Sequence, residues 1–260
     1  MRARLGLIPS SFLVLFFPLI LVSCSGGGSD SPPTPTPTPA PASSSAEGLW
    51  FGSTNTNRTA AGFVLDDGTY YVLYSVPANA TVIAGMVQGN GTSHNGTFTS
   101  ANARDFNLEG LGVLSATISG SYAERQSLSG SITYSVGGVT TFTSTFDPAY
   151  DTTPSLASLT GTYTGQAGSS GVVQSATVTM ASTGVFTGVA ADGCSFTGTT
   201  TPRLRGNIFD VSITAGGAPC SSAGSTIVGI AYFDVPNSRL YAAAPTGDRT
   251  NAVIFLGTKP

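Results

Sequence analysis

The chain has 260 residues, of which 10 are Lys or Arg and 13 are Asp or Glu, so its formal net charge is −3. That length allows one large domain or two small ones with a substantial apolar core. Charged residues make up 9% of the chain, against about a quarter in an average soluble domain. The sequence contains no cluster of Lys and Arg, which argues against nucleic-acid binding. Its 33 glycines and many β-branched residues favour short strands and tight turns.

Residues 1–23 have the pattern of a bacterial signal peptide. A basic start precedes an apolar run over residues 12–22, which is shorter than the roughly 20 residues needed to span a bilayer. The run ends in the sequence Leu-Val-Ser-Cys at 21–24, which resembles the lipobox of bacterial lipoproteins. The alternative interpretation is an ordinary secretory leader that happens to contain a cysteine.

The lipobox resemblance implies that Cys24 becomes the mature N-terminus and carries a diacylglycerol thioether and an amide-linked acyl chain, such as palmitate. Several acyl chains together make a stable membrane anchor. Ser25 stands where an aspartate would retain the protein at the inner membrane. We therefore expect a lipid-anchored protein of the bacterial outer membrane, and its periplasmic or surface orientation stays open.

Residues 24–46 form a tether in this interpretation. The segment is rich in Pro, Thr and Ser, and proline fixes φ and removes hydrogen-bond donors, so an extended polyproline II conformation is expected. The tether is either a spacer that holds the folded part away from the membrane or a linker whose length is not tuned.

A first β domain is predicted over residues 47–150. Asp67-Gly68 is typical of a two-residue type I′ hairpin turn, and the strand after it is apolar on both faces, so we expect it to be covered on both sides. No segment keeps a helical period over ten residues. The first-half strands are expected at 58–66, 69–75, 81–88, 96–100, 113–122, 127–135 and 139–146, after a first strand around 48–52.

A second β domain is predicted over residues 151–260. Thr153-Pro154 indicates the start of a short helical turn at the boundary. Gly161 to Gly165 then repeats the Gly-x-aromatic-x-Gly pattern of Gly48 to Gly52, which suggests a duplication. Strands are expected at 172–181, 184–190, 194–200, 207–214, 226–234, 238–244 and 250–257. The fold class is therefore all-β, an antiparallel meander that forms two successive small barrels or, alternatively, two sandwiches.

The chain contains three cysteines. If Cys24 carries the lipid, Cys194 and Cys220 remain as a pair in an exported protein, and a disulfide is expected between them. Their spacing does not fit a Cys-x-x-Cys redox motif, and the only histidine is distant in sequence, so neither a redox pair nor a metal site is predicted.

Signals for catalysis or metal binding are weak. A hydrolase triad of Ser100, His94 and Asp105 lacks the Gly-x-Ser-x-Gly elbow that would mark the serine. The acidic pairs at 66–67 and 147–151 do not have the spacing of an EF-hand calcium loop. We predict neither catalytic residues, nor a metal, nor a cofactor.

Two groups of residues are candidates for a binding surface. The aromatic side chains of Trp50, Tyr70, Tyr71 and Tyr74 either form such a surface or fill a barrel core. Two arginines in this charge-poor chain each stand next to an aspartate, and they either contact a ligand or form a local ion pair. These arginines are Arg104 and Arg249.

From Gly48-Leu-Trp-Phe-Gly52 through Leu65-Asp-Asp-Gly-Thr-Tyr-Tyr71 to the segment 255–260, the sequence resembles a group of proteobacterial outer-membrane lipoproteins to which no activity is attached. It has a looser likeness to surface lipoproteins built from paired β-barrels that bind host or scavenged ligands. The functional hypothesis is a non-enzymatic envelope lipoprotein that binds another envelope protein or a small ligand. A structural or assembly role and an envelope hydrolase are the alternatives.

Overall fold

The computed structural model describes residues 45–169 and 171–260. The expected signal peptide, the lipidated Cys24 and most of the tether lie outside these residues, so those expectations stay predictions. Ala46, which we assigned to the tether, is fully buried, and its carbonyl accepts a hydrogen bond from the Trp50 indole. The packed part of the chain therefore begins before residue 47. Within the described residues, no helix is long and apolar enough to cross a membrane.

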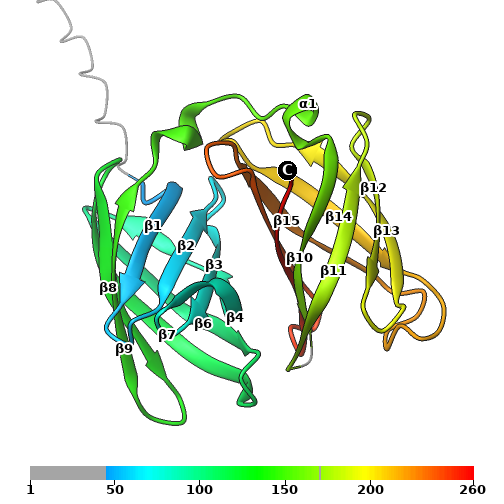
Figure 1. Cartoon of the computed structure of the whole chain (residues 1–260). Helices are drawn as coiled ribbons and strands as arrows, with labels where there is room; N and C mark the ends of the chain where they lie inside the picture. Colours follow the sequence, from blue (N-terminus) through cyan, green and yellow to red (C-terminus); the bar gives the residue numbers. More distant parts are fainter. Residues whose placement is uncertain (1–44, 170) are drawn as a thin grey trace, which may run out of the picture. The chain divides into compact units, whose positions relative to one another are not determined.

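The first half folds into a closed antiparallel barrel (Figure 1). Strands β1–β4 and β6–β9 follow one another around it, β1 pairs with β9, and β4 pairs with β6 to close the ring. Closure removes the exposed strand edges on which other chains could pair. The strands are β1 Gly48–Thr54, β2 Thr59–Val64, β3 Thr69–Val76, β4 Asn79–Asn90, β5 Thr92–His94, β6 Thr97–Asn107, β7 Gly112–Ala123, β8 Ser127–Tyr134 and β9 Val139–Phe146.

Strand β3 shows why both faces of a first-barrel strand are apolar. Tyr70, Val72 and Tyr74 point into the barrel lumen, whereas Tyr71 and Leu73 point outward, because side chains alternate along a strand. The outward pair is nevertheless buried, since strands of the second half pack against it. The prediction that this strand is covered on both sides is confirmed.

The predicted hairpin at Asp67-Gly68 is present, but with a different turn. The Gly68 amide donates to the Leu65 carbonyl at 3.1 Å, and Gly68 adopts a φ of +82°. Asp67 is not in the positive-φ region that a two-residue type I′ turn requires. Instead its carboxylate accepts a hydrogen bond from the Thr69 amide at 2.8 Å. The Leu65 amide donates to the Thr69 carbonyl at 2.8 Å, so the loop contains the three residues 66–68, one more than predicted.

Two short helical turns connect the halves, a 3-10 turn η1 at Pro148–Asp151 and α1 at Leu156–Leu159. Asp147 caps η1 by accepting from the Ala149 amide at 2.9 Å. The predicted helical turn is therefore found, but the prediction that Thr153 caps it was wrong, because α1 begins after Ser155 and Pro154 precedes that cap.

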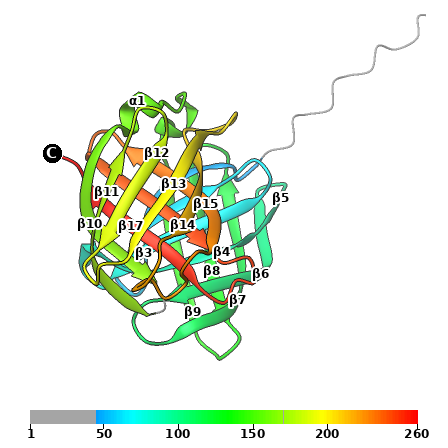
Figure 2. The same cartoon turned by 90° about the vertical axis from the view of Figure 1, so that its right-hand side faces the viewer.

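The second half is a closed barrel of eight strands that follow one another around the ring (Figure 2). The predicted strands from residue 172 onward agree with these strands to within two residues. The all-β prediction of two successive barrels is confirmed, and the sandwich alternative is not adopted. The strands are β10 Gly161–Ser169, β11 Val172–Met180, β12 Val185–Ala190, β13 Ser195–Pro202, β14 Phe209–Ala215, β15 Thr226–Asp234, β16 Arg239–Pro245 and β17 Ala252–Thr258.

The predicted disulfide between Cys194 and Cys220 is present. Cys194 lies in the turn between β12 and β13, and Cys220 lies in the long loop between β14 and β15. The bond therefore joins two turns at the same end of the second barrel.

The repeated Gly-x-aromatic-x-Gly pattern occupies the first strand of each barrel. Trp50 Nε1 donates to the carbonyl of Ala46 at 2.9 Å, and Tyr163 Oη donates to the carbonyl of Leu159 at 2.8 Å, four residues upstream in both cases. Both aromatic side chains are buried inside their barrels. The pattern therefore places an aromatic side chain at one end of each lumen and hydrogen-bonds it to the incoming chain.

The two barrels share a hydrophobic core on their outer faces. The rings of Phe51 and Phe63 pack against those of Tyr232 and Tyr241, with centroids 5.7 to 6.3 Å apart. One buried cluster contains residues of β1–β4 and β6 together with residues of β15–β17. An ion pair also joins the two halves, between Arg203 and Asp66 at 2.8 Å.

Candidate functional site

The lumen of the first barrel contains a cavity of about 310 Å³. All eight strands that close the barrel contribute to its walls, and most of the lining side chains are apolar. A barrel of eight strands is just wide enough either to be filled by its own side chains or to hold one small ligand. The first barrel is not filled by its own side chains.

One end of the cavity is closed by aromatic and aliphatic side chains. Trp50 packs edge-on against Phe146 with ring centroids 5.5 Å apart, and Tyr70 packs in the same way against Phe98 at 5.7 Å. The Tyr70 hydroxyl donates to Ser100 Oγ at 2.9 Å, and burial raises the pKa of Tyr70 to about 12. This end is closely packed and buried.

The middle of the cavity is open because small side chains face it. On β2 the lumen-facing residues are Ala60, Gly62 and Val64. A Cβ built on Gly62 would stand 3.5 Å from Trp50 and 3.8 Å from Val72, an ordinary contact distance. A larger residue at position 62 would therefore not clash with the neighbouring backbone. The absence of a side chain at Gly62 leaves space in the lumen.

The other end of the cavity lies where the turns between β1 and β2, β6 and β7, and β8 and β9 meet. Two apolar side chains stand exposed at this rim, Leu111 at 66% and Val136 at 74% of their full accessible surface. We call this end the mouth. An apolar rim lowers the free-energy cost for an apolar molecule to approach and enter.

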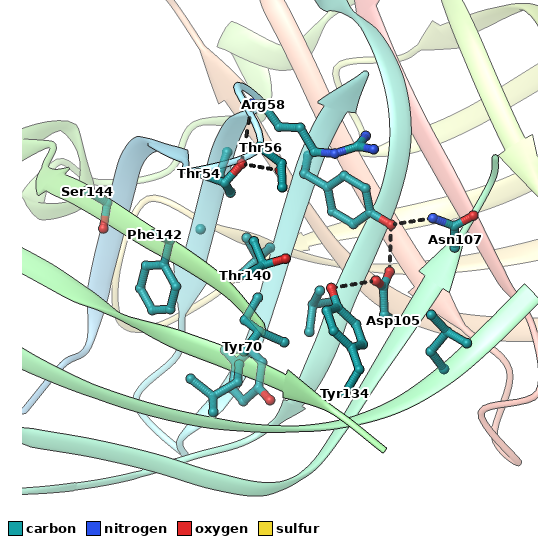
Figure 3. Close-up of a pocket in the computed structure, with 18 of the residues that line it drawn as sticks. Thr54, Thr56, Arg58, Tyr70, Asp105, Asn107, Tyr134, Thr140, Phe142 and Ser144 are labelled. Atoms are coloured by element: carbon teal, nitrogen blue, oxygen red, sulfur yellow. Dashed lines mark hydrogen bonds between the residues drawn. The ribbon is translucent and has the colours of Figure 1, made fainter. Parts of the chain in front are cut away.

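A polar group of four side chains lines the cavity near the mouth (Figure 3). Tyr74 Oη donates to Asp105 Oδ1 at 2.6 Å, and Tyr134 Oη donates to Asp105 Oδ2 at 3.0 Å. Asn107 Nδ2 donates to Tyr74 Oη at 3.3 Å. The Asp105 carboxyl, 3% exposed, is thus held between two tyrosine hydroxyls from strands β3 and β8.

Burial dominates the electrostatics of this polar group. It raises the pKa of Asp105, although the hydrogen bonds from Tyr74 and Tyr134 act in the opposite direction. Burial and the neighbouring Asp105 carboxylate also raise the pKa of both tyrosines, so their hydroxyls keep their protons. A cationic or hydrogen-bond-donating group placed in the cavity would stabilise the charged form of Asp105.

Arg58 lies at the mouth beside this group. Its guanidinium forms an ion pair with Glu109 at 2.7 Å, donates to the Ser75 carbonyl at 2.9 Å, and lies 5.4 Å from the centre of the Tyr74 ring. The Arg58 charge is therefore matched by Glu109, and among the described residues no ion pair joins Arg58 to Asp105.

The predicted aromatic surface divides between two places. Trp50, Tyr70 and Tyr74 line the cavity, whereas Tyr71 packs outward into the core shared by the barrels. Trp50 and Tyr70 are also buried core residues, as the core-filling interpretation expects, and their role in a binding surface stays a prediction.

The two arginines singled out from the sequence do not lie in the cavity. Arg104 points outward from β6 and donates to Ser115 Oγ of β7. Arg249, in the turn between β16 and β17, donates to the carbonyls of Gln88 at 2.6 Å and Asn102 at 2.8 Å, and so joins the second barrel to the first. Within the described residues, neither forms an ion pair with the aspartate next to it in sequence.

The residues that the sequence offered for catalysis or metal binding form hydrogen bonds and ion pairs with other residues. Ser100 accepts a hydrogen bond from Tyr70, His94 hydrogen-bonds Asn95 at 3.0 Å, and Asp105 accepts from two tyrosines, so these contacts do not assemble a triad. The acidic pairs cap turns or face arginines, as Asp147 and Asp66 do. Among residues 45–169 and 171–260, no group of three or more His, Cys, Asp or Glu side chains is arranged to hold a metal ion.

The lumen of the second barrel is filled. The space left inside it is about 60 Å³, the volume of about two water molecules in the liquid. Bulky side chains occupy the rest, among them Met180, Phe186 and Phe255. One end is covered by α1 and by Lys259, whose Nζ lies 4.4 Å from the centre of the Phe233 ring.

The sequence analysis missed Tyr134, Asn107 and Arg58, and it mentioned Asp105 only as a triad candidate. For the two residues on β6, Asp105 and Asn107, a β-bulge changes which side chains face inward. Ser100 pairs with Ile118 and Ala103 pairs with Ala116, so β6 has one residue more than β7 between these pairs. The extra residue reverses the alternation, which turns Asp105 inward and Arg104 outward.

Comparison with protein-family models gives no match, and comparison with curated protein sequences gives none. Among solved structures, the chain is similar to isotype 1 transferrin binding protein B from serogroup B Neisseria meningitidis, with 11% identity and a TM-score of 0.30, over 78% of this chain and 66% of that one. It is also similar to a tryptophan-to-alanine mutant of the vaccine antigen transferrin binding protein B from Haemophilus parasuis Hp5, with 10% identity and a TM-score of 0.29, over 78% of this chain and 51% of that one. Likeness at this level transfers neither a ligand nor a partner to this chain.

Proposed function

We propose that this protein is a non-enzymatic binding protein that takes up a small apolar or amphipathic molecule in the lumen of its first barrel. The observation that carries the proposal is the cavity of about 310 Å³ with apolar walls and one buried carboxyl. Binding sites for small molecules are mostly apolar concave spaces with a few well-placed polar groups. The first-barrel lumen has both features.

The size of the cavity limits the ligand. Ligand pockets range from about 300 to 1,000 Å³, so this one is at the small end. It corresponds to about ten water molecules in the liquid. The cavity therefore suits one small molecule, of the size of an octyl chain with a small polar head or of a small polycyclic aromatic amine, and it is too small for a whole lipid.

A fluorescent probe tests the proposal. N-phenyl-1-naphthylamine is uncharged and gains fluorescence in apolar surroundings, and we expect it to bind the protein at one site. Val72→Trp, which narrows the cavity from β3, should abolish that signal, whereas Val189→Trp, at a 47% exposed strand position of the second barrel, should leave it unchanged. Equal fluorescence in both variants, each shown to be folded by circular dichroism, would refute the proposal.

We further propose that the protein is held at the bacterial outer membrane through lipid on Cys24. The support is the lipobox-like sequence at 21–24 and the serine that follows it. Cys24→Ala should abolish incorporation of a clickable fatty acid in cells, with Cys194→Ser as the matched control that keeps it. Undiminished incorporation in Cys24→Ala would contradict the anchor.

A hydrolase is the less supported alternative. Ser100, His94 and Asp105, which the sequence offered as a triad, form hydrogen bonds to Tyr70, Asn95 and two tyrosines, respectively. These contacts favour the binding function over catalysis at those residues.

A further inference from the structure

Resting on the proposed function, we propose that the ligand of the first barrel is a cationic amphiphile, with an ammonium group at Asp105 and an apolar tail directed toward Trp50. Both ends of this arrangement are lining residues of one cavity.

The Asp105 carboxylate has capacity for further donors. An ionised carboxylate offers about four lone-pair sites. Two of them are used, one on each oxygen, by Tyr74 and Tyr134. An ammonium group carries three donors and no acceptor, so it matches the remaining lone pairs without creating an unsatisfied group.

The charges around the mouth leave one negative charge unmatched. Arg58 is positive and pairs with Glu109, while Asp105 has no ion pair among the described residues. A buried charge without a partner is costly, and a cation brought by the ligand would offset that cost. An anionic head group would instead add a second negative charge beside Asp105.

The orientation follows from where polar and apolar residues lie. Asp105 and Asn107 are near the end of β6 that leads into the mouth, whereas Trp50 and Tyr70 are at the opposite, closed end. The walls between them are apolar, as Val72 and Ile118 illustrate. A molecule that enters tail first buries its chain and leaves its head at the polar group, where each buried CH₂ favours binding.

Three octyl compounds with different heads test the inference on the unmodified protein. Octylamine, 1-octanol and octanoate, used below the concentrations at which they self-associate, compete with N-phenyl-1-naphthylamine for the cavity. We expect octylamine to bind about 10-fold or more tightly than octanol, the range expected of a hydrogen bond to a charged group, and octanoate to bind most weakly. Equal affinities, or tighter binding of octanoate, would overturn the inference and leave the proposed function standing. If none of the three displaces the probe and the probe itself does not bind, both fail.

An isosteric substitution locates the effect at Asp105. Asp105→Asn should remove the preference for octylamine over octanol and leave octanol affinity nearly unchanged. Asp234→Asn is the matched control, because Asp234 is also a buried aspartate, 8% exposed, but belongs to the second barrel. A preference for octylamine that survives Asp105→Asn would show that another group selects the head and would overturn the assignment.

Discussion

The two barrels have the same number of strands and the same opening pattern, yet one is hollow and the other is full. The cavity of the first is about 310 Å³ and that of the second about 60 Å³. The difference teaches that the barrel architecture sets only the width of the lumen, and that the side chains facing inward decide whether it holds a ligand.

Equivalent positions make this comparison concrete. Trp50 pairs with Gly62 in the first barrel, and the corresponding Tyr163 pairs with Val178 in the second. At the next pair that faces the lumen, Gly48 pairs with Val64 in the first barrel and Gly161 pairs with Met180 in the second. At both positions the second barrel carries the larger side chain, so its lumen is filled where the first is open.

The ends of the barrels also differ. The turns at the mouth of the first barrel carry Leu111 and Val136, and no cysteine occurs in that barrel. At the corresponding end of the second barrel, the Cys194–Cys220 disulfide joins two turns. The disulfide of the second barrel therefore lies at the end that corresponds to the open mouth of the first barrel. This difference is consistent with a supporting role for the second barrel.

The largest effect is expected from a cavity made in the full barrel. Phe186→Ala should reduce the free energy of unfolding by about 3–5 kcal/mol, because it opens a void in a packed lumen. Phe142→Ala, at a lining position of the first-barrel cavity, should cost clearly less, since that ring already borders open space. Denaturant unfolding of both variants measures the difference, and equal losses would break the comparison.

The disulfide comes next in size. Replacing both Cys194 and Cys220 by serine should lower stability by about 3–4 kcal/mol on the loop-entropy model, for a separation of 26 residues. Thermal unfolding with and without reductant checks this. Binding of N-phenyl-1-naphthylamine to the first barrel should persist in the variant below its unfolding temperature, and loss of that binding would contradict the separation of roles.

A matched enlargement probes both lumens. Ala231→Leu adds volume to the second barrel, where Ala231 is 1% exposed, and should destabilise by about 1–3 kcal/mol through overpacking. Ala60→Leu adds the same atoms to the open lumen and should be neutral or stabilising while it weakens probe binding. Destabilisation of the same size by both would show that the first lumen is not open.

The smallest effect concerns pH. Because burial raises the folded-state pKa of Asp105, the folded protein binds more protons than the unfolded chain between the two pKa values, and stability falls as pH rises through that window. The Asp105→Asn variant has no carboxyl at this position, so its stability should not fall in this way as pH rises. It should be more stable than the wild type at pH values above the folded-state pKa of Asp105, and the difference should disappear at low pH. Unfolding curves from pH 3 to pH 8 test the sign. A variant less stable than the wild type at pH 8 would contradict an unpaired buried carboxylate.

Much of the fold follows from local chemistry in the sequence. Alternation and Gly-containing turns predict most strands, and Tyr71 with Leu73 opposite Tyr70 predicts burial on both faces of β3. The disulfide follows from elimination once Cys24 is assigned to the lipid. The strand predictions depend on residues close together in the chain, and the disulfide prediction depends only on the number of cysteines.

The site was less accessible to sequence analysis, because it depends on a bulge and on partners far apart in the chain. One extra residue between Ser100 and Ala103 decides whether Arg104 or Asp105 faces inward. Tyr74 and Tyr134 meet Asp105 only after the barrel closes. Arg104 was predicted as a binding residue because it stands next to an aspartate in a charge-poor chain, and nothing in that pattern shows which of Arg104 and Asp105 faces inward.

A crystal structure of the protein with 8-bromooctylamine tests the central claim most directly. The anomalous signal of bromine locates the tail without ambiguity. The account predicts one bromine site inside the first barrel near Trp50 and Tyr70, with the amine within hydrogen-bond distance of Asp105, and no bromine in the second lumen. A bromine found only on the outer surface, or inside the second barrel, would contradict it.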